Sequence, residues 1–335
     1  MLGSSSIGLH AFGTRTCLTW RRCTVPFRRS ITGGALAALV ISSGWIAPTV
    51  PRAALQGDTC SVSVSGAEDP TKMPDALVWE AVFKQQRGAA LQAPPAAPAS
   101  AALVSALRTT GTVALDRVEA LRATLRVAES GPGATSRDRD LLVADTILDA
   151  RDAVAGRSSP EEFDAMLTLA ESAARRLSFA VPSAGQTATL ADGRQVCRAS
   201  IVGKDAPQLI PDHVVWSSVF RMFARAAATQ RGTDGRVSDE FVIAQQRTGM
   251  PSPAADVRAF VDVAAEAAAD IAAEQSTAGD GSREASLAQL VRLQRVVMKA
   301  RLRVQRRVSA EGWRGILARV EKSREDTQVF FSSAR

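Results

Sequence analysis

The sequence predicts an all-α protein with a minor β component, formed by tandem duplication of a four- to five-helix bundle unit that opens with a short β element. Residues 60–83 recur as residues 197–220, with ten of 24 positions identical and no gap. A repeat of this length indicates two copies of one structural unit. In both copies, apolar residues then follow at the three- and four-residue spacing of amphipathic helices, which must bury one face.

The chain divides into a leader, residues 1–57, and two repeat units, residues 58–185 and 186–335. Basic residues precede an uncharged stretch at residues 30–51, so the leader is interpreted as a signal peptide or membrane anchor. If it is not removed, we expect membrane contact through residues 30–51, which are long enough to span a bilayer. An organellar transit peptide is a third interpretation. We expect an exported protein, periplasmic or secreted.

Each unit opens with a short β element. The alternating residues 60–65 and 196–202 predict strands, and an Asp-Gly pair at 192–193 predicts a hairpin turn in the second copy. A Pro-Asp pair then predicts the start of a helix in both copies. Asp75 and Asp212 are expected to be the capping residues of these helices.

The first unit continues with further helical segments. Residues 101–108, 113–129 and about 138–155 are predicted as helices. Ser159 begins a strong start signal for the last helix, because proline follows it and a glutamate lies three residues after it.

The second unit repeats the last two helices at an offset of 150 rather than 137 residues, so about 13 extra residues lie before them. We expect longer or additional helical turns there, with caps at Ser238 and Ser252. Trp79 and Trp216, at equivalent positions one turn into their helices, are expected to anchor the core of each unit.

Two cysteines remain after the leader, Cys60 and Cys197, at equivalent positions. In an oxidising compartment we expect them to form a disulfide that joins the two units. The alternative is one separate buried thiol in each unit.

Composition argues against several functions. The six arginines of the leader account for most of the formal charge of +7, and the rest of the chain carries only +1, which removes the electrostatic case for a nucleic-acid partner. His213 is the only histidine after the leader, and phosphate-binding, dinucleotide-binding and hydrolase motifs are missing from the sequence. We therefore expect no cofactor and no metal, although a site assembled from both units is not excluded.

A basic face lies on the helix predicted near residues 285–310. Its five residues recur at three- and four-residue spacing opposite an apolar stripe, and they are Arg292, Arg295, Lys299, Arg303 and Arg306. This face can meet an anionic partner, either a protein or an anionic surface. The alternatives are a solvated helix face, or internal attraction to the acidic residues of 138–152.

Arg151 and Arg301 occupy equivalent positions at the edge of the two apolar stripes. A matched pair of this kind suggests a repeated internal salt bridge or cap, with Asp75 and Asp212 as candidate partners. The alternative is that both arginines extend over the core with their charged ends in water.

The function expected from these observations is that of an exported, non-enzymatic helical protein with a binding, scaffold or chaperone-like role. Two alternatives remain. One is an enzyme with a site between the two repeat units, and the other is a structural protein associated with the cell envelope. Whether the protein is an enzyme is left open by the sequence, which leans against it.

Overall fold

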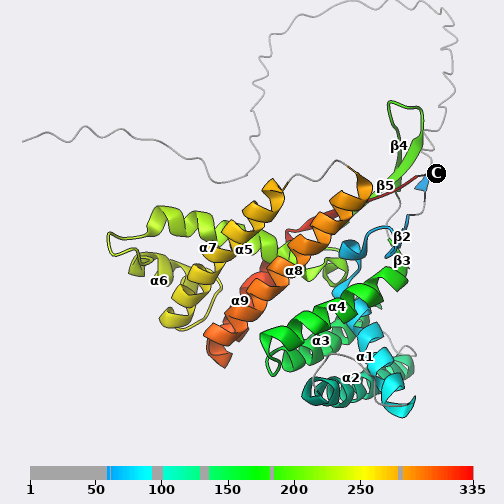
Figure 1. The fold of residues 1–335 in the computed structure, drawn as a ribbon, viewed down its shortest axis with the longest axis horizontal. Coiled ribbons are helices and arrows are strands. Elements are labelled where there is room, and N and C mark those ends of the chain that lie inside the picture. The colour runs from blue at the N-terminus through cyan, green and yellow to red at the C-terminus, as the bar shows by residue number, and fades with distance from the viewer. Residues whose placement is uncertain are drawn as a thin grey trace, which may run out of the picture. The chain divides into compact units, whose positions relative to one another are not determined.

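The computed structural model describes residues 59–60, 62–92, 101–128, 136–181, 185–277 and 282–334. This part of the chain is mostly helical, with nine α-helices, two short 3-10 turns and six short strands. The prediction of an all-α bundle fold with a minor β component is therefore confirmed (Figure 1).

Four helices form the first group: α1 (Asp75–Gln92), α2 (Ala101–Ala128), α3 (Ser136–Ala155) and α4 (Pro160–Arg176). The start of α4 is as predicted, because Ser159 accepts a hydrogen bond from the backbone of Glu162 and the Glu162 side chain bonds back to Ser159. The prediction of two separate helices at 101–108 and 113–129 is wrong. Gly111 lies inside the continuous helix α2, where a Cβ would come within 3.1 Å of Phe83, so the glycine permits close packing rather than a break.

Five helices form the second group: α5 (Asp212–Gln230), α6 (Asp239–Arg247), α7 (Ala254–Ser276), α8 (Arg283–Arg307) and α9 (Ala310–Glu325). The short helix α6 lies where extra helical turns were expected, and Ser238 caps it as expected, accepting a hydrogen bond from the backbone N–H of Phe241. The cap predicted at Ser252 is wrong. Its hydroxyl instead donates to the carbonyl of Gly312 on α9 at 3.1 Å, which ties α9 to the start of α7.

The strands form two small antiparallel sheets. One has the order β1-β4-β5-β6 and the other pairs β2 with β3. Their bounds are β1 (Thr59–Cys60), β2 (Ser63–Ser65), β3 (Ser178–Ala180), β4 (Gly185–Thr189), β5 (Gln195–Val202) and β6 (Gln328–Ala334). The predicted hairpin is confirmed: β4 pairs with β5, and Gly193 at the turn has a φ of 82°.

The same strand register occurs in both groups. Ser63 pairs with Ala180 and Val64 with Phe179. At offsets of 137 and 150 residues, Ser200 pairs with Phe330 and Ile201 with Val329. In both places the strand that opens the group is therefore paired with the strand that follows its last helix.

A glycine closes this arrangement in each group. The N–H of Gly66 donates to the carbonyl of Leu177 at 2.6 Å, and the N–H of Gly203 donates to that of Thr327 at 2.7 Å. A Cβ on either glycine would overlap a backbone carbonyl at the end of the last helix, Ala174 in one group and Arg324 in the other. Only glycine allows this close approach.

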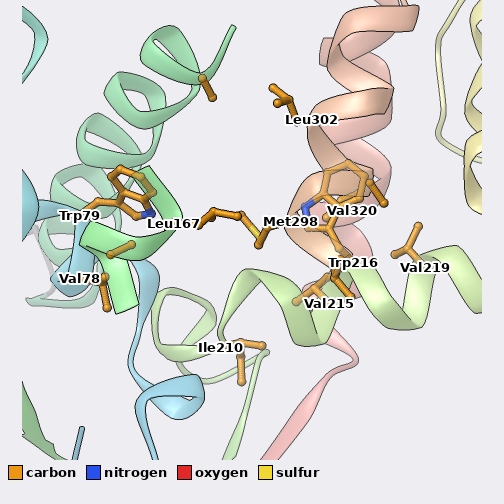
Figure 2. Packing of buried hydrophobic residues seen from close by; sticks show 14 of the residues in the cluster. Val78, Trp79, Leu167, Ile210, Val215, Trp216, Val219, Met298, Leu302 and Val320 are labelled. Carbon is orange, nitrogen blue, oxygen red and sulfur yellow. The ribbon is translucent and has the colours of Figure 1, made fainter. Parts of the chain in front are cut away.

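The core is one continuous apolar cluster that includes residues of both groups. Trp79 and Trp216 are 2% and 1% exposed, as expected of core anchors. Leu167 of α4 and Met298 of α8 extend toward each other in the space between the two tryptophans (Figure 2). The two helical groups are thus joined by apolar packing as well as by the chain.

Leu55–Arg335 form one compact unit. The leader, residues 1–57, and the membrane contact expected through residues 30–51 lie outside the described residues. Of the helices described, none combines the length and the apolar character needed to cross a membrane.

Candidate functional site

Six charged side chains meet where the two helical groups join, and we call them the central ionic network. Asp75 and Asp212 are the first residues of α1 and α5, Arg151 and Asp152 lie near the end of α3, Arg301 lies on α8, and Arg324 lies in the last turn of α9. The network has three positive and three negative groups, so its formal charge is balanced. Arg151, Asp212 and Arg301 are each no more than 2% exposed.

Asp212 is the hub of the network. Its Oδ2 accepts a hydrogen bond from Nη1 of Arg151 at 2.6 Å, and its Oδ1 accepts one from Nη2 of Arg324. The Nε of Arg301 lies 3.8 Å from Oδ2. Asp212 is therefore surrounded by guanidinium groups from three different helices.

Asp152 bridges the two equivalent arginines. It accepts a hydrogen bond from Nε of Arg151 at 2.9 Å and two from Nη2 of Arg301, at 2.7 and 2.6 Å. Arg324 completes its own hydrogen bonding by donating from Nη1 to the carbonyl of Ile210 at 2.6 Å. A buried ion group of this kind persists only when nearly every donor and acceptor is paired.

The side chain of Asp75 caps the first helix of the other group rather than its own helix. Its Oδ2 accepts a hydrogen bond from the backbone N–H of Asp212 at 2.6 Å, and its Oδ1 lies 3.8 Å from Arg151. The prediction that Asp212 caps its own helix is wrong. Pro211 precedes the helix without a side-chain cap, and the free N–H at the start of α5 is satisfied by Asp75 from the other group.

The environment separates the pKa values of the two equivalent aspartates. Burial raises the pKa of Asp212, but Arg151, Arg324 and Arg301 lower it by more, so the net pKa lies well below the usual range. Burial and then the neighbouring Asp212 carboxylate raise the pKa of Asp75 to about 6. Burial likewise raises the pKa of Asp152, and Arg151 and Arg301 outweigh it, so that its net pKa is lowered.

Arg301 also packs against two indole rings. Its guanidinium carbon lies 5.5 Å from the centre of the Trp216 ring and 5.0 Å from that of Trp313, and the two rings are stacked 5.8 Å apart. The aromatic faces stabilise the buried cation in addition to the carboxylates. Arg151 and Arg301 thus have their charged ends in the network and not in water.

The five basic residues of the predicted anionic-partner face are all paired within the protein. Arg292 pairs with Glu274, Arg295 with Glu171 at 2.9 Å, Lys299 with Asp164 at 2.8 Å, Arg303 with Asp270 at 3.0 Å, and Arg306 donates to the Ser158 carbonyl. These contacts favour the intramolecular interpretation. The acidic partners come from α4 and α7, however, and not from residues 138–152 as that interpretation supposed.

A cleft of about 240 Å³ opens beside the network, between the two helical groups. Its polar lining includes Asp75, Asp145, Glu321 and Arg324. Burial and then the charge of Glu321 raise the pKa of Asp145. The seam between the groups is therefore not uniformly apolar.

His213, next to Asp212, has its pKa lowered to about 4 by burial. Its Nδ1 is buried without a hydrogen-bond partner among the described residues. The residues that the structure describes contain no group of three or more histidine, cysteine or acidic side chains that could hold a metal ion.

The network contains two residues that the repeat could not identify. Asp152 and Arg324 align with Leu302 and Ala174 at the offset of 150, so neither has a charged counterpart. The sequence did offer one indication, because both residues lie among the apolar positions of their helices. A charged side chain on a buried helix face needs a partner inside the protein.

Cys60 and Cys197 lie within disulfide-bonding distance, with Cα atoms 6.0 Å apart. They are on β1 and β5, each of which pairs with β4. The geometry is that of a bond between the two halves of the chain across 137 residues.

No family model, no curated protein and no solved structure matches the chain. The functional argument therefore rests on the contacts described above.

Proposed function

We propose that this chain is an exported, non-enzymatic protein that binds a partner or acts as a scaffold through its helical surfaces. The observation that carries this proposal is the central ionic network. Where two helical groups meet, an enzyme that used the seam would need reactive groups free to contact a substrate. Here Arg151, Arg324 and Asp212 instead contact one another and the main chain.

We further propose that the two groups arose by tandem duplication. The matching strand register, the two closing glycines and the equivalent aspartates support this proposal. On this view the Cys60–Cys197 pair and the central ionic network hold two related bundles in one fixed arrangement, which suits a rigid binding surface.

A chaperone-like version of the role predicts that the purified protein suppresses aggregation of an unfolding client without ATP. Suppression at a stoichiometric ratio would support it. A client that aggregates at the same rate with and without the protein would exclude the chaperone-like version and leave the scaffold version. Sequencing the N-terminus of the mature protein tests export, because removal of the leader exposes a new terminus between about residues 47 and 57.

A second candidate is an enzyme acting in the cleft between the groups. The specific observation in its favour is the polar cleft next to Asp75, whose pKa of about 6 suits proton transfer. Hydrolysis of chromogenic esters or glycosides that is lost in Asp75→Asn, in protein whose circular dichroism matches that of the wild type, would support it. Activity that is unchanged by this substitution would assign the turnover to a contaminant.

The proposed partner is a protein or an anionic surface, and the charge balance argues against nucleic acid. Because the basic face of α8 is paired with acids of α4 and α7, a partner at that face must displace them. An envelope-associated structural role is compatible with the same surface.

A further inference from the structure

A groove between α5 and α9 is lined by three arginines and differs from the basic face of α8. Arg221 and Arg225 of α5 line one side and Arg319 of α9 lines the other. Its volume is about 800 Å³. Among the described residues, none of the three arginines has an acidic side chain within ion-pair distance, whereas the five basic residues of α8 discussed above are all paired.

The hydrogen bonds that these arginines do make are weak or local. Arg221 donates to the carbonyl and hydroxyl of Ser217 on its own helix, at 3.2 and 3.3 Å. Arg319 reaches only the sulfur of Met222, at 3.8 Å, and its Nε is buried without an acceptor. A buried guanidinium N–H without an acceptor is costly, and in this groove it accompanies two further guanidinium groups that have no acidic partner among the described residues.

One arginine of the groove, Arg221, has a basic counterpart in the first helical group, whereas Gly88 and Leu169 stand at the positions of Arg225 and Arg319. Lys84, the counterpart of Arg221, pairs with Glu80 at 2.8 Å, and Arg122 joins the same carboxylate at 3.2 Å. Glu80 is 8% exposed, so the anion is built into the helix pair. In the second group the position of Glu80 is occupied by Ser217, and the built-in anion is lost while the cation is kept.

We infer that the groove formed by Arg221, Arg225 and Arg319 binds a phosphate group. Several guanidinium groups around one hollow match an oxyanion with three or more acceptor oxygens and a double charge better than a carboxylate with two oxygens. Ser218, whose exposed side chain lines the groove, adds a hydroxyl donor. Asp326 is the one acid in the lining, and its charge would repel an anion, so we expect the phosphate to lie closer to the arginines than to this carboxylate.

The ligand is either a small soluble phosphate compound or the headgroup of an anionic phospholipid, because both present the same group. The groove lies on α5 and α9, away from the five basic residues of α8. Failure of this inference would therefore leave the proposed scaffold role standing, and failure of the scaffold role would leave the groove unaffected.

The test uses the full chain in two binding assays. The first is calorimetric titration with inorganic pyrophosphate, and the second is sedimentation with phosphatidylcholine vesicles that either contain or lack phosphatidylglycerol. The groove variant carries Arg221→Gln, Arg225→Gln and Arg319→Gln. The matched control removes the same charge from α8 through Arg292→Gln, Lys299→Gln and Arg303→Gln.

We expect wild-type protein to bind in at least one assay and the groove variant to bind at least about tenfold more weakly, while the α8 control retains its affinity. Binding of pyrophosphate alone assigns a soluble ligand, and vesicle binding that pyrophosphate competes away assigns a headgroup. Ser218→Trp, which fills the groove without changing its charge, should weaken binding as well. An absence of binding in both assays, or an equal loss in the groove variant and the α8 control, would overturn the inference.

Discussion

The carboxylate of Asp75 accepts a hydrogen bond from the backbone N–H of Asp212 at 2.6 Å, although the two residues are 137 positions apart. The two aspartates occupy the same position in their respective groups, as the first residue of a helix that follows a proline. Their roles are nevertheless different. Asp75 caps the helix of the other group, while Asp212 contacts three arginines, so matched positions of the sequence have two different roles in one network.

Removing the charge at the hub should be strongly destabilising. Asp212→Asn leaves Arg151 and Arg324 buried beside a neutral amide, and we expect it to lower the free energy of unfolding by about 3–5 kcal/mol. Urea unfolding followed by circular dichroism measures this change. Asp205→Asn, at an exposed position in the preceding loop, is the matched control and should change stability by less than about 0.5 kcal/mol. Similar values for the two variants would show that the network contributes little.

Much of the helical architecture could be predicted because it depends on local chemistry. The cap at Ser159, the hairpin turn at Gly193 and the helix starts at Asp75 and Asp212 each follow from a few adjacent residues. The local rules failed where tertiary contact decided the outcome. The helices predicted at 101–108 and 113–129 are one continuous helix, in which Gly111 packs against Phe83.

The central ionic network was only partly predictable for a related reason. The repeat identified Arg151, Arg301 and the two aspartates because each has a counterpart. Asp152 and Arg324 have none, and their pairing across the seam depends on how the two groups pack. The repeat also gave no information about which basic residues of α8 and α5 find acidic neighbours, since those neighbours come from other helices.

Two neighbouring groups should give opposite dependences of stability on pH. The pKa of Asp75 is raised to about 6, so its contribution to stability is present at low pH and is lost as the pH rises through that value. The pKa of His213 is lowered to about 4, so its contribution is present at high pH and is lost as the pH falls from its unfolded value of 6.5. In the wild-type protein the two dependences oppose each other.

Single substitutions should separate these effects. Between about pH 7 and about pH 5, His213→Gln should become more stable on acidification, because the Asp75 contribution is then unopposed. Asp75→Asn should become less stable over the same range. Asp145, whose pKa is also raised, acts in the same sense as Asp75 and is present in both variants. Urea midpoints measured across this range provide the test, and parallel pH profiles for the two variants would contradict the assignment.

Cys60 and Cys197 should be oxidised in protein that is purified without a reducing agent. Electrospray mass under non-reducing conditions should be lower by two hydrogen atoms than after reduction, whereas two free thiols would contradict the bond. On the chain-entropy model, closing a loop across 137 residues stabilises the protein by about 5 kcal/mol, and we expect a loss of about 2–5 kcal/mol in Cys197→Ser. The same substitution should have no added effect in protein that is already reduced.

The two closing glycines should tolerate no side chain. In Gly66→Ala and Gly203→Ala the new methyl group would overlap the carbonyl oxygen of Ala174 or Arg324, so the strand must move away from the end of the last helix. We expect each substitution to lower the free energy of unfolding by about 2 kcal/mol or more.

Gly88→Ala is the matched control, because a Cβ there has no atom within 4 Å and the residue lies in α1. It should stabilise the protein by up to about 1 kcal/mol, since alanine favours the helix. Because the two glycines make the same contact, their losses should be alike, and a loss at only one of them would mean that the two groups do not depend on this closure equally.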